Sequence, residues 1–452
     1  MTRDPDKRHP DVVGALRRTP RGDLVGKIAD RLRADGTHWM LVGALLAAVG
    51  AYLFQLIASR SLGQVRYAPI GTLWTIQYLT VSIFLHSVET YVARASLRPR
   101  AQPISILSGR IWGPVTLVAV ATTIFAWVFR ESLFLGEGYL AVVSGCAALS
   151  FGAFMIVRGR LAGAGRFKAY GLVTASESLS RLALAILVAV VAGGTLLFAS
   201  IMPLGALAAA AWWFGLRRPA EPMSTEVPDG RAGTTRFLLL TSSANAITHF
   251  LLAGGPLVLA FLKASPAAVS ILFVTLTAAR LPIVFVFGGI LSRSLGTFTR
   301  LADADRGRRL RRAVVWIATG TVAAAMVAGG LAAIAGSALI GLLFGAGFRP
   351  PWWVAAGATV GVLLATGGMV LNQVLVATVA EHRLPWPWFA GLLGAALTIG
   401  LVAGPVLNRV MAAFVTGEAI ALAGLVIAIR ASRRDLVPAS ADGSPTLPVD
   451  RL

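Results

Sequence analysis

Long apolar stretches alternate with short polar segments along most of this chain. About 20 apolar residues in a helix are enough to cross the roughly 30 Å hydrocarbon core of a bilayer. The pattern therefore predicts an all-α polytopic membrane protein with about 12 transmembrane helices. The expected spans are 38–59, 68–88, 111–129, 138–157, 170–192, 194–216, 237–262, 267–291, 313–334, 352–378, 386–408 and 410–429.

Two places interrupt this regular pattern. Only Gly193 separates the fifth span from the sixth, so we expect a tight hairpin at Gly193 and Gly194. The apolar segment 337–344 is too short to cross a bilayer, and we expect it to lie at the membrane interface before the tenth span.

The polar segments divide the chain into five parts. The longest internal one, 217–236, separates six spans from six, which favours two six-helix lobes around a central cavity, an arrangement common among transporters. The predicted parts are a basic N-terminal arm at 1–36, an N-terminal lobe at 37–216, a linker at 217–236, a C-terminal lobe at 237–430 and a disordered tail at 431–452.

The charge of the chain follows the same pattern. Only 13% of residues are charged, against about 25% in soluble proteins, which excludes an ordinary soluble enzyme. The net charge of +21 does not require a nucleic-acid partner, because the cations lie in alternate loops. With a cytoplasmic N-terminus, 33 of the 41 Lys and Arg residues are cytoplasmic and six are external. Both termini are therefore predicted to be cytoplasmic, and the basic loops can bind anionic lipids.

Nothing in the sequence indicates an enzyme or a cofactor. The single cysteine, Cys146, excludes an intramolecular disulfide and lies in an apolar run. All twelve Asp residues fall outside the predicted spans, no metal-ligand spacing is present, and no Walker motif indicates ATP hydrolysis.

Two arginines lie deep in predicted spans. Arg181 is about eleven residues into the fifth span and Arg280 about thirteen into the eighth, so both are near the bilayer midplane at about 1.5 Å per residue. Arginine stays protonated, so each must face water, a carboxylate or an anionic ligand. Glu177 lies one turn before Arg181 and can pair with it.

Each arginine has a structural and a functional interpretation. Arg181 can form a structural pair with Glu177, and Arg280 can bind Glu418 or a backbone carbonyl on another helix. Two mid-membrane cations also suit a cavity that receives a pyrophosphate, whose oxygens match bidentate donors. Further candidates for this substrate-binding cavity are polar span residues: Asn245, His249, Asn372 and Gln373. Asn and Gln in spans are also common interhelical hydrogen-bond partners.

Four stretches resemble the polysaccharide-flippase branch of the multidrug/oligosaccharidyl-lipid/polysaccharide (MOP) exporter superfamily. They are AYLFQLIASRSLGQVRYA (51–68), RGRLAGAGRFKAYGLVTASESLSRLAL (158–184), TAARLPIVF (277–285) and LNQVLVA (371–377). His86 and Glu89, at the end of the second span, depart from that pattern.

The resemblance implies a flippase or exporter with two six-helix lobes and alternating access. Its substrate would be a polyprenyl-(pyro)phosphate-linked glycan, and Glu177, Arg181 and Arg280 would be cavity residues. Glycan-synthesis proteins would be partners. The chain has four Lys against 37 Arg and is rich in Ala and Gly, which is typical of a high-GC bacterium and predicts the bacterial cytoplasmic membrane.

Three alternatives remain open. A drug/cation antiporter of the same superfamily needs a titratable carboxylate deep in a lobe, and the absence of Asp from the spans counts against it. The major facilitator fold also has twelve spans, and DADRGRRLRR (303–312) superficially matches its loop signature. A non-transporting scaffold of a glycan synthase would not need mid-membrane arginines.

Overall fold

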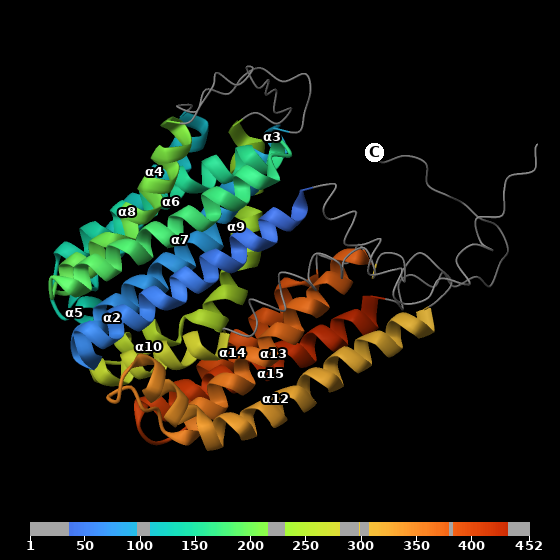
Figure 1. Ribbon diagram of the computed structural model, residues 1–452. Helices are drawn as coiled ribbons and strands as arrows, with labels where there is room; N and C mark the ends of the chain where they lie inside the picture. The colour runs from blue at the N-terminus through green and yellow to red at the C-terminus, as the bar shows by residue number, and fades with distance from the viewer. Residues whose placement is uncertain are drawn as a thin grey trace, which may run out of the picture.

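The computed structural model describes residues 36–96, 109–215, 231–280, 298, 307–378 and 383–432. Within these ranges the regular secondary structure is helical throughout (Figure 1). The elements are α2 (Thr37–Thr80), η2 (Val81–Leu85), α3 (His86–Ser96), α4 (Gly109–Val128), α5 (Arg130–Phe134), α6 (Tyr139–Gly163), α7 (Phe167–Val190), α8 (Thr195–Gly215), α9 (Arg231–Ala253), α10 (Gly255–Phe261), the helix Pro266–Arg280, α12 (Gly307–Phe344), α13 (Trp352–Ala377), α14 (Pro385–Leu401) and α15 (Val406–Ser432).

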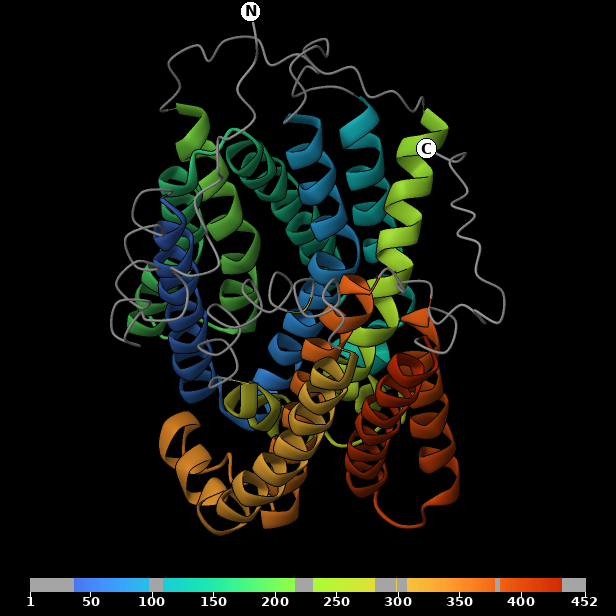
Figure 2. The same cartoon turned by 90° about the vertical axis from the view of Figure 1, so that its right-hand side faces the viewer.

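The helices form two groups, seen apart in Figures 1 and 2. In the N-terminal bundle, α2–α8, α2 packs on α7, and α6 packs on both α4 and α8. In the C-terminal bundle, α12–α15, α13 packs on α12 and α15, and α15 packs on α14. Helix α9 contacts elements of both bundles, because it packs on η2 and α3 as well as on α14 and α15. The all-helical prediction is confirmed.

Helix α2 contains two predicted spans joined by a sharp turn. Gly63 has φ 69° and ψ 174°, a left-handed conformation that glycine adopts without steric cost. This turn separates the two helical segments of α2, which correspond to the predicted spans 38–59 and 68–88. The tight hairpin between α7 and α8 is also present, with the Gly193 N–H donating to the Val188 carbonyl at 2.9 Å.

A close helix crossing explains the contact between α2 and α7. A Cβ atom added at Gly43 would lie 2.3 Å from the carbonyl oxygen of Gly171, a distance that real Cβ atoms do not reach. Glycines at both positions therefore allow the two backbones to touch, as small residues do at membrane helix interfaces.

Two predicted elements differ from the structure. The expected span 237–262 is broken, because α9 ends at Ala253 and α10 begins at Gly255 with Pro256 in its first turn. The segment 337–344 is not a separate interfacial piece but the last turns of α12, which ends at Phe344. No proline interrupts that helix, and Gly345, with φ 114°, ends it.

Eight described helices are long and apolar enough to cross a membrane, with shorter apolar helices at Pro266–Arg280 and Pro385–Leu401. The chain is therefore a multi-pass membrane protein. The count of twelve crossings, the cytoplasmic termini and the domain boundaries stay predictions. The arm at 1–35, most of the linker and the tail from 433 lie outside the described residues.

Candidate functional site

Arg181 and Glu177 form an ion pair on α7, as their spacing of one helical turn predicted. Both side chains are buried, and the hydroxyl of Ser178 donates to the Glu177 carboxylate at 2.8 Å. The pair therefore neutralises the charge of Arg181 within its own helix, although Nε of Arg181 is buried without a hydrogen-bond partner among the described residues.

Aromatic rings complete the surroundings of Arg181. Its guanidinium lies 4.7 Å from the ring centre of Trp74, 5.6 Å from that of Phe151 and 6.0 Å from that of Phe54. Rings at these distances attract a cation through their electron-rich faces. All these partners belong to the N-terminal bundle, so the contacts of Arg181 favour its structural interpretation. A role of Glu177 and Arg181 in a substrate cavity stays a prediction.

Arg280 has a different set of partners. Its Nη2 donates to the carbonyl of Leu252 at the end of α9, and its guanidinium lies 5.8 Å from the ring centre of Tyr78. The Leu252 carbonyl is free because Pro256, four residues later, has no N–H to donate to it. Tyr78 in turn is hydrogen-bonded to Nδ1 of His249 at 3.1 Å. Three elements distant in sequence thus meet at Arg280.

Glu418 on α15 is the carboxylate associated with this site. It is 1% exposed, and neither carboxylate oxygen has a hydrogen-bond partner in the part of the chain that the structure describes. Its charge and that of Arg280 influence each other electrostatically, but no ion pair joins these two described residues. Nε of Arg280 is also buried without a partner. Unpaired buried polar atoms are costly, so this arrangement has unused capacity to bind an ion or a proton.

The other predicted cavity residues are distributed over α9 and α13. Asn372 accepts a hydrogen bond from the indole of Trp388 on α14 at 3.2 Å, which ties two helices of the C-terminal bundle together. Asn245 and Gln373 are half-buried. Two pairs of predicted residues thus lie together. His249 is linked to Arg280 because both contact Tyr78, and Glu177 is paired with Arg181 at a separate place.

Sequence reasoning missed Tyr78 and Trp74. They lie one turn apart on α2, and each faces one of the two arginines. Aromatic residues four apart, flanking Gln77 in an otherwise apolar span, were a usable indication. Without the partner helices, however, such residues are indistinguishable from core side chains.

A third polar cluster lies at the predicted cytoplasmic end of the N-terminal bundle. Glu89 is paired with Arg158 at 3.3 Å and accepts a hydrogen bond from the Tyr170 hydroxyl at 2.9 Å. Nδ1 of His86 lies 3.6 Å from the same carboxylate. This cluster joins α3, α6 and α7, so its contacts are those of a structural network.

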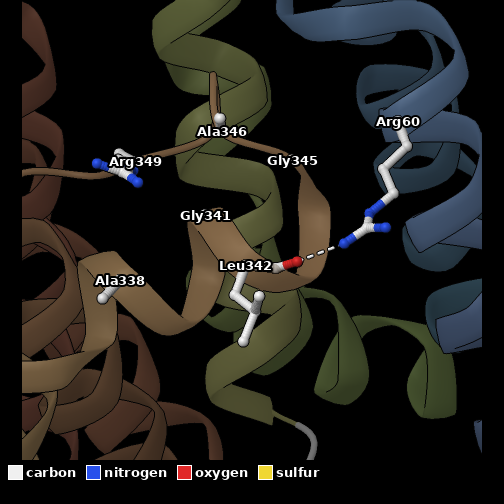
Figure 3. A pocket seen from close by; sticks show the side chains of 7 residues that line it. All are labelled: Arg60, Ala338, Gly341, Leu342, Gly345, Ala346 and Arg349. Carbon is white, nitrogen blue, oxygen red and sulfur yellow. Dashed lines mark hydrogen bonds between the residues drawn. The ribbon is translucent and has the colours of Figure 1, made fainter.

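At the opposite end, the two bundles are joined by hydrogen bonds to the end of α12. Nε of Arg60 donates to the Leu343 carbonyl at 2.8 Å, and Nη2 donates to that of Leu342 (Figure 3). The Ser59 hydroxyl donates to the Phe344 carbonyl at 3.2 Å. Arg60 and Arg349 also line a pocket of about 640 Å³ at this end (Figure 3). The bundles are thus closed together at this predicted outer end.

Comparison with known proteins identifies the fold. No protein-family profile and no curated protein matches the sequence. The chain is similar to the inward-facing conformation of a multidrug resistance MATE family transporter of the MOP superfamily, with a TM-score of 0.65, 14% identity, and 88% of this chain and 96% of that chain covered. For an outward-facing conformation the TM-score is 0.58 at 15% identity, with 89% and 96% covered.

A third similar structure is a MOP superfamily transporter from Pyrococcus furiosus, whose binding pocket has a reversed polarity that suggests a different function. The TM-score is 0.57 at 12% identity, with 88% of this chain and 95% of that chain covered. The chain therefore has the MATE-like fold of MOP-superfamily transporters. This fold is not that of the major facilitators, so that alternative is wrong.

Proposed function

We propose that this protein is a transporter that moves an anionic, lipid-linked glycan across a bacterial cytoplasmic membrane by alternating access. The observation that carries the proposal is the state of Arg280. It is a permanent, half-buried cation at a predicted mid-membrane position, and among the described residues it is bound to a backbone carbonyl and a tyrosine ring rather than to a carboxylate. Such a cation keeps its charge for an anionic ligand.

The chemistry of Arg280 suits a phosphate or pyrophosphate. A guanidinium offers five donors in a planar fork, and among the described residues a single nitrogen of Arg280 donates a hydrogen bond, to the Leu252 carbonyl. Tyr78 and His249 add a hydroxyl and an imidazole close to that fork. A lipid-linked sugar phosphate would therefore find a charge and additional hydrogen-bonding groups in one place.

Two features support alternating access. The chain is similar to both inward-facing and outward-facing transporters, with the higher TM-score for the inward-facing one. The bundles are joined at the predicted outer end by Arg60 and Ser59. Opening there would require breaking these hydrogen bonds, each of modest net free energy, and separating the ring contacts of Tyr52 with Phe344 and of Tyr67 with Phe348.

Depletion of the protein tests this proposal. We expect a lipid-linked sugar to accumulate on the cytoplasmic leaflet, and the wild-type gene to clear it. Arg280→Ala should express and fold but fail to clear the lipid, whereas Arg349→Ala, a matched arginine elsewhere, should clear it. Normal envelope glycans after depletion would overturn the lipid-linked substrate.

A drug/cation antiporter is the second candidate, and Glu418 favours it. The sequence argument against an antiporter rested on the absence of Asp from the spans, but Glu418 is a buried carboxylate with both oxygens unpartnered among the described residues. Such a group can take up and release a proton or a cation as its surroundings change.

Dye efflux separates the two candidates. An antiporter should extrude cationic dyes, and Glu418→Gln, which cannot release a proton, should abolish that efflux. If the protein is a glycan flippase, its depletion should leave dye sensitivity unchanged. The Glu418→Gln variant, in which Arg280 is intact, should then retain lipid transport. Glu137→Gln serves as the matched carboxylate control, because Glu137 lies outside the helices, between α5 and α6.

A further inference from the structure

An apolar groove lies between the N-terminal bundle and helices α9 and α10. Its volume is about 480 Å³, within the range of small-molecule sites. The side chains that line it are Ile76, Leu79, Thr80, Ile83, Phe84, Leu117, Val118, Ala121, Thr122, Phe125, Phe250 and Leu257.

The lining is apolar apart from two threonine hydroxyls. On α2 and η2 the lining residues recur at three- and four-residue spacing, so a single helical face forms one wall. On α4 the spacing is the same, which forms the facing wall. Leu117 is 69% exposed and Phe84 is 43% exposed, so the groove opens to the lipid-facing surface.

A cluster of aromatic rings includes the groove residue Phe125. Phe261 of α10 lies 6.0 Å from Phe125 and 5.1 Å from Phe129, measured between ring centres. Both phenylalanines are near the end of α4, which is the predicted outer end. A chain in the groove would therefore meet this cluster towards the predicted outer end.

The groove shares two helices with the Arg280 site. Leu79 of α2 and Phe250 of α9 line the groove, while their sequence neighbours Tyr78 and His249 are hydrogen-bonded to each other. This hydrogen bond lies at the contact between α2 and α9, which we call the α2–α9 seam. The Arg280 site and the apolar groove both adjoin this seam. A ligand that occupies both needs an anionic head and a hydrocarbon chain.

A π-helical turn is built into the groove wall. Element η2, Val81–Leu85, follows α2 directly and contributes Ile83 and Phe84 to the lining. A π turn widens the helix by one residue and occurs frequently at functional sites. It changes the direction in which the following side chains point, and so shapes the wall that faces α4.

We propose that this groove binds the hydrocarbon chain of the transported lipid while Arg280 binds its phosphate. The inference rests on the proposed lipid-linked substrate and extends it to a second contact region. Charge complementarity at Arg280 and the shared α2–α9 seam select the chain of the substrate as the occupant, in preference to an unrelated protein segment or a bulk lipid.

Blocking the groove without adding charge tests the proposal. Ala121 is exposed and lines the groove, whereas its neighbour Val120 is 49% exposed and lies outside it. Ala121→Trp should fill the groove, and Val120→Trp is the matched control on the same lipid-facing helix. Both proteins, together with Ala121→Phe and Arg280→Ala, are assayed in nanodiscs for binding of undecaprenyl phosphate and of the short-chain isopentenyl diphosphate.

Excluding even two methylene groups from the groove should weaken undecaprenyl phosphate binding about tenfold. We expect this loss in Ala121→Trp, a smaller loss in Ala121→Phe and none in Val120→Trp. Isopentenyl diphosphate should bind to all three as to the wild type, because its chain is too short to need the groove. Arg280→Ala should lose both ligands.

Each other outcome has a definite meaning. Equal undecaprenyl phosphate binding by Ala121→Trp and the wild type would overturn the groove while leaving the role of Arg280 intact. Normal binding of both ligands by Arg280→Ala would instead overturn the proposed function. Full displacement of undecaprenyl phosphate by dioleoylphosphatidylglycerol, equally in the wild type and Val120→Trp, would assign the groove to ordinary membrane lipid and also overturn the proposal.

Discussion

Arg181 and Arg280 are the same residue type at the same predicted depth, yet their surroundings differ. Arg181 is enclosed by a carboxylate on its own helix and by three aromatic rings of one bundle. Arg280 is bound to a carbonyl of α9, lies over a tyrosine of α2 and influences an unpaired carboxylate on α15. The first arginine is satisfied within one bundle, and the second depends on helices from different parts of the chain.

This difference shows that depth in the membrane does not by itself define a functional cation. What matters is whether the charge is neutralised by permanent partners. A buried ion pair leaves little attraction for a ligand, whereas a cation bound to a neutral carbonyl retains its charge. The comparison therefore supports our proposal that Arg181 stabilises the fold and that Arg280 binds the ligand, and it can be tested one residue at a time.

The largest effect on stability is expected from Glu177→Ala. Removing the carboxylate leaves the Arg181 guanidinium buried without its partner, which typically costs about 3–5 kcal/mol. Thermal unfolding in detergent should show a large decrease in melting temperature. The control is Glu131→Ala, whose carboxylate forms an exposed pair with Arg130 at 3.9 Å and should contribute less than about 1 kcal/mol. Equal melting of both variants would contradict the structural role of the pair.

Arg280→Ala should show the opposite pattern. We expect transport to fall by about a hundredfold or more, as for loss of a charge-assisted contact of about 3 kcal/mol, while stability changes by about 1 kcal/mol through loss of the bond to Leu252. Arg280→Lys should restore little transport, because an ammonium cannot reproduce a planar bidentate contact. A large loss of stability with normal transport per folded molecule would assign Arg280 to fold stability.

A smaller effect is expected for Glu418→Gln. Because neither carboxylate oxygen accepts a hydrogen bond, an amide of similar shape should fold at least as well as the carboxylate. Melting temperature should stay equal or rise slightly, and glycan transport should be retained. If stability instead falls sharply and is restored by Arg280→Met in the double variant, the two charges form a structural pair and the contrast with Arg181 disappears.

A modest effect, on conformation rather than on stability, is expected from Arg60→Gln, which removes an arginine that donates to two backbone carbonyls. Loss of its bonds to Leu342 and Leu343 should shift the conformational equilibrium by about 1 kcal/mol towards an outer-open state. Spin labels on the outer ends of the two bundles should report a larger population of long distances. An unchanged distance distribution would show that these bonds do not hold the bundles together.

Local pattern was sufficient for parts of this fold. The predicted spans 111–129 and 352–378 match α4 and α13 closely, because each is a continuous apolar run with polar ends. The Glu177–Arg181 pair was also predictable, since residues four apart share a helical face. Both cases depend only on neighbours in the sequence.

The Arg280 site was not predictable in the same way. Its partners Tyr78 and Leu252 are brought to it by tertiary packing, and the free carbonyl depends on a proline in the following helix. The sequence Gly254–Gly255–Pro256 did indicate a break in the span 237–262, but its apolar composition favoured continuity. A hydropathy pattern does not record which backbone groups lack a partner.

The contacts at the end of α12 have a consequence for how this protein can evolve. On the C-terminal bundle the acceptors at Leu342, Leu343 and Phe344 are main-chain oxygens, so replacing those side chains leaves the acceptors in place. Only the donor side, at Ser59 and Arg60, can be altered by a single substitution. Natural variation that removes these hydrogen bonds should therefore accumulate at Ser59 and Arg60, whereas a substitution of Phe344 would act through the packing of its ring on Tyr52.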